Sequence, residues 1–185
     1  RAWHLEYAHR TADHFHGPLT FAMMSAPTIG EGLGAIGRYM SIRASYLRSG
    51  TSRTGRDFSI ELIESQDLGD IRHLLLEITF RILHDYVAMI GDVNLAAATL
   101  SLTYPAGEDR AYYDKGFNCR VLFDQDANVL TMPAAWMAIP NPQHEQSTWT
   151  NAIAQCEVAL SELDQEDAVA RTRSFINATM IREPA

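Results

Sequence analysis

A segment with helical periodicity lies between two segments that alternate, and this order constrains the fold more than any other feature. Residues 67–90 carry apolar side chains at helical spacing, and Gly91 follows as a stop signal. Apolar and polar residues alternate before this segment, over residues 58–63, and after it, over residues 100–104. Alternation is typical of a strand with one buried face. The pattern therefore predicts strands crossed by one long helix, which Asp67 can cap. Its expected buried stripe is Leu68, Ile71, Leu75, Ile78, Ile82 and Tyr86.

Start and stop signals predict several helices and a hairpin before this region. Residues 2–13 read as a helix, and Pro18 suits the first turn of a short helix that runs to Ser25. Thr28 and Glu31 have the spacing of a capping box. The helix that they start is expected to bury Ile29, Leu33, Ile36, Met40, Ala44 and Leu47. A hairpin with its loop at residues 50–55 follows.

Four glycines fall inside the helix that starts at Thr28, at positions 30, 32, 34 and 37. Each costs about 1 kcal/mol relative to alanine in a helix interior. Their number predicts that a neighbouring helix or a ligand packs closely against this surface.

The C-terminal half is expected to add short strands and then helices. A one-turn helix is predicted at residues 110–114, an extended piece with Val121 and Phe123, and a last strand at 128–132. Residues 140–142 (Pro-Asn-Pro) are the clearest breaker, and helices are expected at 144–163 and 166–181. The predicted fold class is α+β: an N-terminal helical layer, a small, mostly antiparallel sheet of three to five strands crossed by the long helix, and C-terminal helices.

Composition excludes several classes of protein. The 185 residues contain 23 acidic and 15 basic side chains, for a net charge of −8, whereas a domain that grips DNA phosphates needs a basic face. No apolar run approaches the length of a membrane span. The two cysteines, Cys119 and Cys156, provide no disulfide framework, which is typical of the cytoplasm.

The motifs of common catalytic and cofactor sites are missing or out of context. Residues 32–37 satisfy GxGxxG, but the capping box has already started the helix and no strand precedes it. His9, His14 and His16 lack cysteine or carboxylate partners at metal-site spacing. No nucleophile elbow, phosphate-binding loop or Cys–His signature is present. We therefore expect no enzyme activity, no metal and no cofactor. Residues 39–43 (YMSIR) do match the YxSxR pattern of haem-based sensor domains, so a haem sensor stays an alternative.

A ligand pocket is expected between the helical layer and the sheet. Arginines at 38, 43, 48, 53 and 56 occur with no acid between Glu31 and Asp57. They are either a solvated surface or, for Arg43, a contact to an anionic ligand. Pockets are mostly apolar with a few polar groups. The predicted lining is Met24, Tyr39, Arg43, Arg72, Arg81 and Tyr104.

Two segments about seventy residues apart carry a family resemblance. Residues 16–31 read HGPLTFAMMSAPTIGE, with Arg38-Tyr39 following, and residues 112–123 read YYDKGFNCRVLF. In this order they resemble the N-terminal ligand-binding (arabinose-binding-type) domain of AraC-type transcription regulators. The resemblance covers nearly the whole chain.

The resemblance implies a bacterial cytoplasmic sensor of a small effector: an amino acid, an organic acid or a fatty acid-like compound. It implies an effector-binding domain at residues 1–163 and a helical lead-in at 164–185 to a C-terminal helix-turn-helix module, through which alone DNA would be bound. The family's first helices are expected before Arg1. A second copy of the chain is a further candidate partner, and no membrane is expected. The alternatives are a stand-alone haem or lipid sensor and a dimerisation scaffold without ligand.

Overall fold

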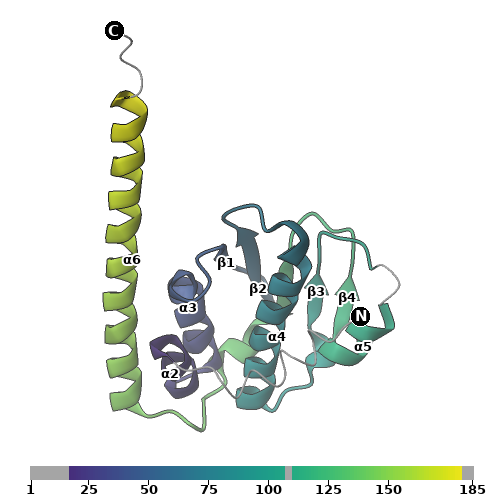
Figure 1. The fold of residues 1–185 in the computed structure, drawn as a ribbon. Helices are drawn as coiled ribbons and strands as arrows, with labels where there is room; N and C mark the ends of the chain where they lie inside the picture. The colour runs from purple at the N-terminus through teal and green to yellow at the C-terminus, as the bar shows by residue number, and fades with distance from the viewer. Residues whose placement is uncertain (1–16, 107–109, 181–185) are drawn as a thin grey trace.

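The computed structural model describes residues 17–106 and 110–180 and confirms the predicted α+β class. Figure 1 shows α4 (Arg72–Gly91) lying across a sheet, with α2 (Pro18–Ser25) and α3 (Ile29–Tyr39) to one side and α6 (Gln146–Met180) beyond them. The short helix α5 (Arg110–Phe117) lies at the opposite end, beside β4. The helix expected at residues 2–13 is outside the described residues.

The sheet has five strands in the order β1-β2-β5-β3-β4. Their bounds are β1 Leu47–Thr54, β2 Asp57–Glu64, β3 Thr99–Ser101, β4 Arg120–Leu122 and β5 Val129–Pro133. All neighbours pair antiparallel except β3 and β4, so the prediction of a mostly antiparallel sheet is confirmed. The hairpin loop is shorter than predicted: β1 continues to Thr54, which pairs with Asp57, and Gly55 takes a φ of +60° in the two-residue turn.

One row of apolar side chains crosses the sheet and forms the centre of the core. Ile60 pairs with Leu130, Leu130 with Leu100, and Leu100 with Val121. Each of these four residues is buried. On the opposite face, the neighbouring row carries Ser59 and Thr131 hydroxyls 3.0 Å apart. The sequence alternation over 58–63 is thus the alternation between these two faces.

Helix α3 starts as predicted but ends earlier. The Thr28 hydroxyl accepts from the Glu31 amide at 3.2 Å and donates to the Glu31 carboxylate at 3.1 Å. The helix ends at Tyr39, and a 3-10 turn, η2 (Met40–Ile42), follows. The prediction that Leu47 belongs to this helix is wrong: Leu47 is the first residue of β1, and it is buried there as a strand residue.

The buried stripe of α4 also differs from the prediction. Ile71 is 54% exposed and sits in η3 (Gly69–Ile71), the 3-10 turn that precedes the helix. The prediction that Asp67 caps the long helix is wrong: the N-cap of α4 is Ile71, and Asp67 instead accepts from the Gly69 amide at 2.9 Å, at the start of the 3-10 turn. The residues that α4 buries are Leu76, Glu77, Phe80, Leu83, His84, Tyr86, Val87 and Ile90. The helix carries two apolar stripes, and the buried one contains Glu77 and His84. Tyrosine hydroxyls from distant segments bond Glu77, whereas His84 Nδ1 lies 2.9 Å from the neighbouring Asp85 of the same helix.

The C-terminal region forms one helix where the sequence predicted two. Helix α6 runs unbroken from Gln146 to Met180, through the gap between helices that was expected at 164–165. Two short 3-10 turns, η4 (Leu95–Ala97) and η5 (Ala134–Ala138), occur earlier in the chain. Neither Asp164 nor Gln165 is a strong helix breaker. At about 1.5 Å per residue, its 35 residues span roughly 50 Å. Figure 1 shows its C-terminal part extending beyond the rest of the domain.

A second, smaller core attaches α6 to the helical layer. Leu19 and Ala22 of α2, Ala35 and Tyr39 of α3, and Ala152 and Cys156 of α6 are buried together. Asn141 connects the same region to the end of the sheet, because its side-chain amide donates to the carbonyls of Met24 (2.7 Å) and Ala26 (2.9 Å). None of the described helices combines the length and the apolar composition that a membrane span requires.

Candidate functional site

Arg72 and Tyr104, two of the six residues predicted to line a pocket, contact each other. The Arg72 guanidinium carbon lies 5.8 Å from the centroid of the Tyr104 ring, within cation–π range. Arg72 is the first residue of α4, and Tyr104 follows β3 in the chain. They lie at the centre of a polar network that joins four segments of the fold.

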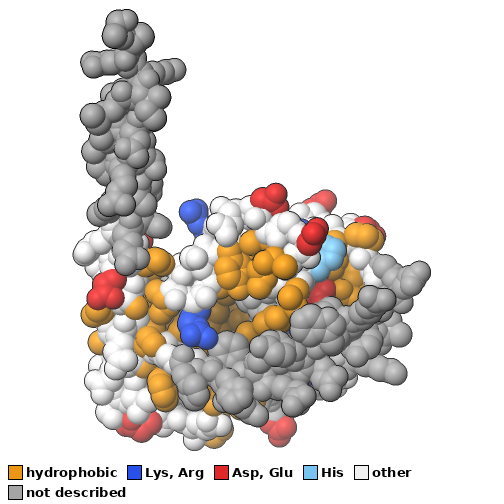
Figure 2. Space-filling model, in the orientation of Figure 1, with side chains coloured by type: hydrophobic (Ala, Val, Ile, Leu, Met, Phe, Trp, Pro, Cys, Tyr) orange, Lys and Arg blue, Asp and Glu red, His pale blue; other side chains and the backbone are white. Residues whose placement is uncertain are grey.

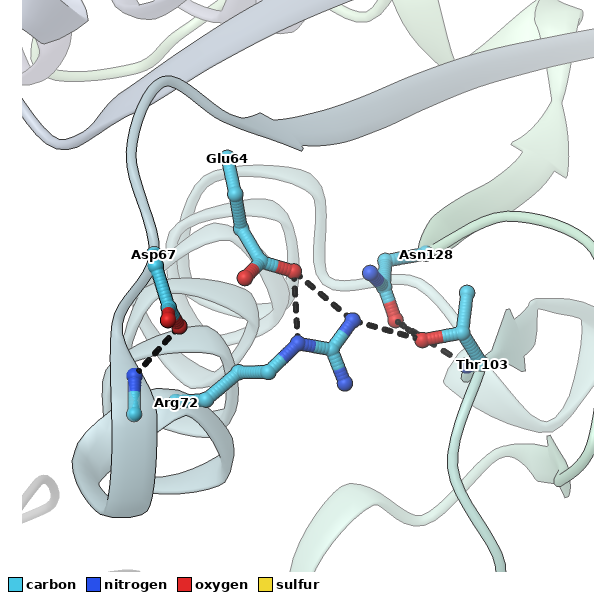
Figure 3. Close-up of polar contacts among 6 residues, drawn as sticks. Glu64, Asp67, Arg72, Thr103 and Asn128 are labelled. Atoms are coloured by element: carbon cyan, nitrogen blue, oxygen red, sulfur yellow. Dashed lines mark hydrogen bonds and ion pairs between the residues drawn. The ribbon is translucent and has the colours of Figure 1, made fainter.

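Arg72 pairs with Glu64 at the end of β2, as Figure 3 shows. Its Nε and Nη2 atoms each lie 2.7 Å from Oε1 of Glu64, and Nη2 also donates to the Thr103 hydroxyl at 2.8 Å. The side chains of Arg72 and Glu64 are 28% and 22% exposed, so solvent reaches both. This ion pair connects the start of α4 to the end of β2.

Asn128 extends the network to the strand β5. Its side-chain oxygen accepts from the Thr103 amide at 3.0 Å and from the Thr103 hydroxyl at 3.2 Å (Figure 3). Asn128 is buried, and its main-chain oxygen accepts from the Leu62 amide of β2 at 2.9 Å. Thr103 is therefore fixed from both sides, by Arg72 and by Asn128.

Beneath Tyr104 lies a buried carboxylate, Glu77, with 1% of its surface exposed. Its Oε1 atom accepts hydrogen bonds from the Tyr104 hydroxyl at 3.0 Å and from the Tyr113 hydroxyl of α5 at 2.5 Å. Burial raises the pKa of Tyr104, and the nearby Glu77 charge raises it further. Tyr104 thus stays a protonated donor, and Glu77 holds α4 against α5.

Aromatic rings surround Tyr104 on its other sides. His73 stacks on it with ring centroids 3.9 Å apart, and Phe123 meets it edge-on at 6.5 Å. Phe123 also packs edge-on against Tyr113 at 4.9 Å. These contacts fix the plane of the ring that faces Arg72.

Arg81, a third predicted residue, lies further along α4 in a separate network. It donates to Asp85 at 2.7 Å and to the carbonyl of Gly116 in α5. His84 Nδ1 lies 2.9 Å from the other Asp85 oxygen. Burial alone would raise the pKa of Asp85, but the hydrogen bonds from His84 and Arg81 and the charge of Arg81 lower it. This network is a second attachment of α5 to α4.

The remaining three predicted residues lie on the α2–α3 side. Met24, half-buried near the end of α2, packs against the main core. Arg43 is exposed just after η2. Tyr39 faces α6, where its hydroxyl donates to Glu157 at 2.5 Å, and burial followed by this hydrogen bond raises its pKa to about 12. Tyr39 belongs to the smaller core, so the six residues do not gather around one point.

Sequence reasoning missed Glu64, Glu77, Thr103, Tyr113 and Asn128. The one available signal was Glu77 with His84, seven residues apart on a helix, which marks a shared face. Thr103 and Asn128 gave no local signal, because their role depends on a contact across the sheet. Among the described residues, no three side chains of the metal-binding types gather in one place.

The surface around this network is partly apolar. Figure 2 shows apolar side chains over the region of α4, with acidic and histidine side chains beside them. Ile71, directly before Arg72, is 54% exposed, whereas Met89, which is 53% exposed, lies near the far end of α4. A separate hollow lies along α6, lined by Glu157, Leu160, Ser161, Asp164 and Gln165, and none of the six predicted residues lines it.

Comparisons with known proteins agree with the predicted family. The family model described as "Arabinose-binding domain of AraC transcription regulator, N-term" matches residues 2–141. The crystal structure of transcriptional regulator CdpR from Pseudomonas aeruginosa aligns with a TM-score of 0.68 and 18% sequence identity, over 89% of this chain and 59% of that one. At this identity the likeness shows the fold, and the chain spans less than two thirds of that regulator. A comparison with curated proteins found no significant match. Since the family model covers most of its length, the chain belongs to the family of arabinose-binding N-terminal domains of AraC transcription regulators.

Proposed function

We propose that the chain is the effector-sensing part of an AraC-type regulator and that the Arg72–Tyr104 network is its ligand site. Family membership supports the regulatory role. The observation that carries the site is the convergence of Arg72, Glu64, Thr103 and Asn128 from four segments, with 28% of the Arg72 side chain exposed to solvent. The polar network faces an aromatic ring and lies beside apolar surface, and such a mixture is typical of small-molecule sites.

In this proposal the effector acts by changing contacts between segments. A ligand shifts an equilibrium only through different affinities for the two states. Rearrangement at the start of α4 would alter the packing of the domain or its association with a second copy. Helix α6 would carry the change to a helix-turn-helix module that follows residue 185, which alone would contact DNA. The regulator would work in the bacterial cytoplasm without catalysing a reaction.

A thermal-shift screen of this chain tests the sensing role. The library contains amino acids, organic acids, sugars and fatty acids. A ligand that binds the native state raises the melting temperature by mass action. A reproducible rise with one chemical class, lost in Arg72→Gln but kept in Arg43→Gln, is the expected result. A rise that Arg72→Gln leaves unchanged would place the site elsewhere.

The alternative haem-sensor role depends on Tyr39 and Arg43 of the YxSxR pattern. The Tyr39 hydroxyl donates to the Glu157 carboxylate, which would repel an anionic propionate at that position. This contact favours the small-molecule sensor. A Soret absorption band in freshly purified protein would reverse that preference.

A further inference from the structure

We propose that the effector carries a carboxylate, which takes the place of Glu64 on Arg72. This inference rests on the proposed sensing function and names the class of ligand. Glu64 would then act as an internal competitor that occupies the guanidinium until the effector arrives.

The ion pair leaves part of the guanidinium unused. Arginine binds a carboxylate best through two parallel hydrogen bonds to two different oxygens. Here Nε and Nη2 of Arg72 both bond Oε1 of Glu64, and Nη2 is also shared with Thr103. Figure 3 shows Nη1 pointing away from Glu64 and Thr103, with no hydrogen bond to any residue drawn. An incoming carboxylate can therefore bind this guanidinium more completely than Glu64 does.

Exposure makes the exchange feasible. The Arg72 and Glu64 side chains are 28% and 22% exposed, so water reaches the pair. When one carboxylate replaces another, the guanidinium keeps a charged partner, and the cost of leaving it unpaired is avoided. Glu77 provides the contrast, because it is almost fully buried and one of its oxygens already accepts from two tyrosine hydroxyls. Of these two carboxylates, Glu64 is the one that a ligand can displace while the buried contacts stay intact.

The surroundings of Arg72 also favour a carboxylate. His73 is exposed one position after Arg72 and stacks on the buried Tyr104 ring, so it offers a planar surface beside the guanidinium. Asp67, on the same connection, is already engaged by the Gly69 amide. The aromatic pair suits a ligand with a flat or apolar body attached to the acid group.

Release of Glu64 would alter a defined part of the fold. Glu64 is the last residue of β2 and Arg72 the first of α4, so their pair closes the connection at residues 65–71. When the effector replaces Glu64, the end of β2 loses its attachment to α4. Binding at one guanidinium is thus coupled to the junction between the sheet and the long helix.

The test measures carboxylate binding in variants with opposite expected effects. Benzoate, succinate and hexanoate are titrated at constant ionic strength, with benzamide, succinamide and hexanamide as uncharged matches. Melting temperature and the NMR signals of the arginine Nε–H groups are followed. Glu64→Gln should lower the dissociation constant of a carboxylate about three- to fivefold, because the side chain that competes for Arg72 has lost its charge. Arg72→Gln should abolish binding, and Arg72→Lys should weaken it.

Arg38 and Glu157 supply the control, since they form a second, more exposed arginine–glutamate ion pair at 2.8 Å between α3 and α6. Arg38→Gln and Glu157→Gln should leave carboxylate affinity unchanged. The inference is overturned if Glu64→Gln weakens binding as much as Arg72→Gln does, or if Arg72→Gln has no effect. If amides, amines or sugars bind and carboxylates do not, the ligand class is wrong and the sensing role survives. If no compound of any class binds, both proposals fail.

Discussion

The Tyr86 hydroxyl of α4 lies where a side chain on Gly32 of α3 would have to be. A Cβ atom built on Gly32 would be 1.8 Å from this oxygen and 2.6 Å from the ring carbon that bears it. Both residues are buried, and α3 and α4 are in contact here. The absence of a side chain at position 32 is what allows Tyr86 to pack against the backbone of α3.

Gly32→Ala is therefore expected to destabilise the domain by about 1–3 kcal/mol, the usual cost of overpacking. Gly34→Ala is the matched control, because a Cβ there meets nothing within 4 Å. It should stabilise the same helix by up to about 1 kcal/mol through helix propensity. Urea unfolding of both variants measures the difference. If the two variants changed the free energy of unfolding equally, the Tyr86 side chain would have to move away from position 32 at no cost.

Removing either tyrosine hydroxyl that bonds Glu77 should lower the free energy of unfolding. Tyr104→Phe and Tyr113→Phe are each expected to cost about 1–3 kcal/mol, as for hydrogen bonds to a charged group. Because both hydroxyls bond the same oxygen, the double variant should differ from the sum of the two. A double-mutant cycle by urea unfolding checks this. Strict additivity would indicate that the two contacts are independent.

The attachment of α6 should depend on Tyr39 more than on Arg38. Both side chains contact Oε1 of Glu157, but the side chain of Arg38 is 64% exposed, whereas Tyr39 is buried. We expect Tyr39→Phe to cost about 1 kcal/mol and Arg38→Ala less than about 0.5 kcal/mol. Amide hydrogen exchange of residues 149–160 measures how much less stable this part of α6 becomes in each variant. A larger effect of Arg38→Ala would mean that the ion pair dominates.

Lowering the pH is expected to destabilise the start of α6, because protonation of Glu145 removes the hydrogen bonds that its carboxylate accepts there. Hydrogen bonds from Thr148 and then Ser147 lower the pKa of this carboxyl from 4.5 to about 2. A lowered pKa in the folded state means that the contribution is complete above the ordinary value and is lost as the pH falls towards 2. NMR titration of the Glu145 carboxyl, with exchange of the Thr148 amide, follows the loss. Glu145→Gln should remove most of this pH dependence, and a midpoint near 4.5 in the unaltered chain would contradict the prediction.

Local signals predicted much of the fold. The capping box at Thr28 and Glu31, the proline at position 18, and the alternation over 58–63 each depend on residues within a few positions of one another. Such short-range effects are visible in a sequence, and together with the order of the two motif segments they were enough to predict the α+β class and the family.

The candidate site depended on contacts that no local pattern encodes. Arg72 and Tyr104 were expected near a pocket, but their partners Glu64, Thr103 and Asn128 are brought together by strand order across the sheet. Helix α4 offered two apolar stripes of equal periodicity. The stripe with Glu77 was buried because Tyr104 and Tyr113, from distant segments, supply its hydrogen bonds.

The sequence by itself thus determined which segments are helices or strands, within the limits seen at Leu47 and in α6, because propensity, capping and periodicity act over a few residues. The tertiary structure decided which faces are buried and which polar groups meet. Burial of a charged group is stable only when its partners are present, and here those partners come from distant parts of the chain.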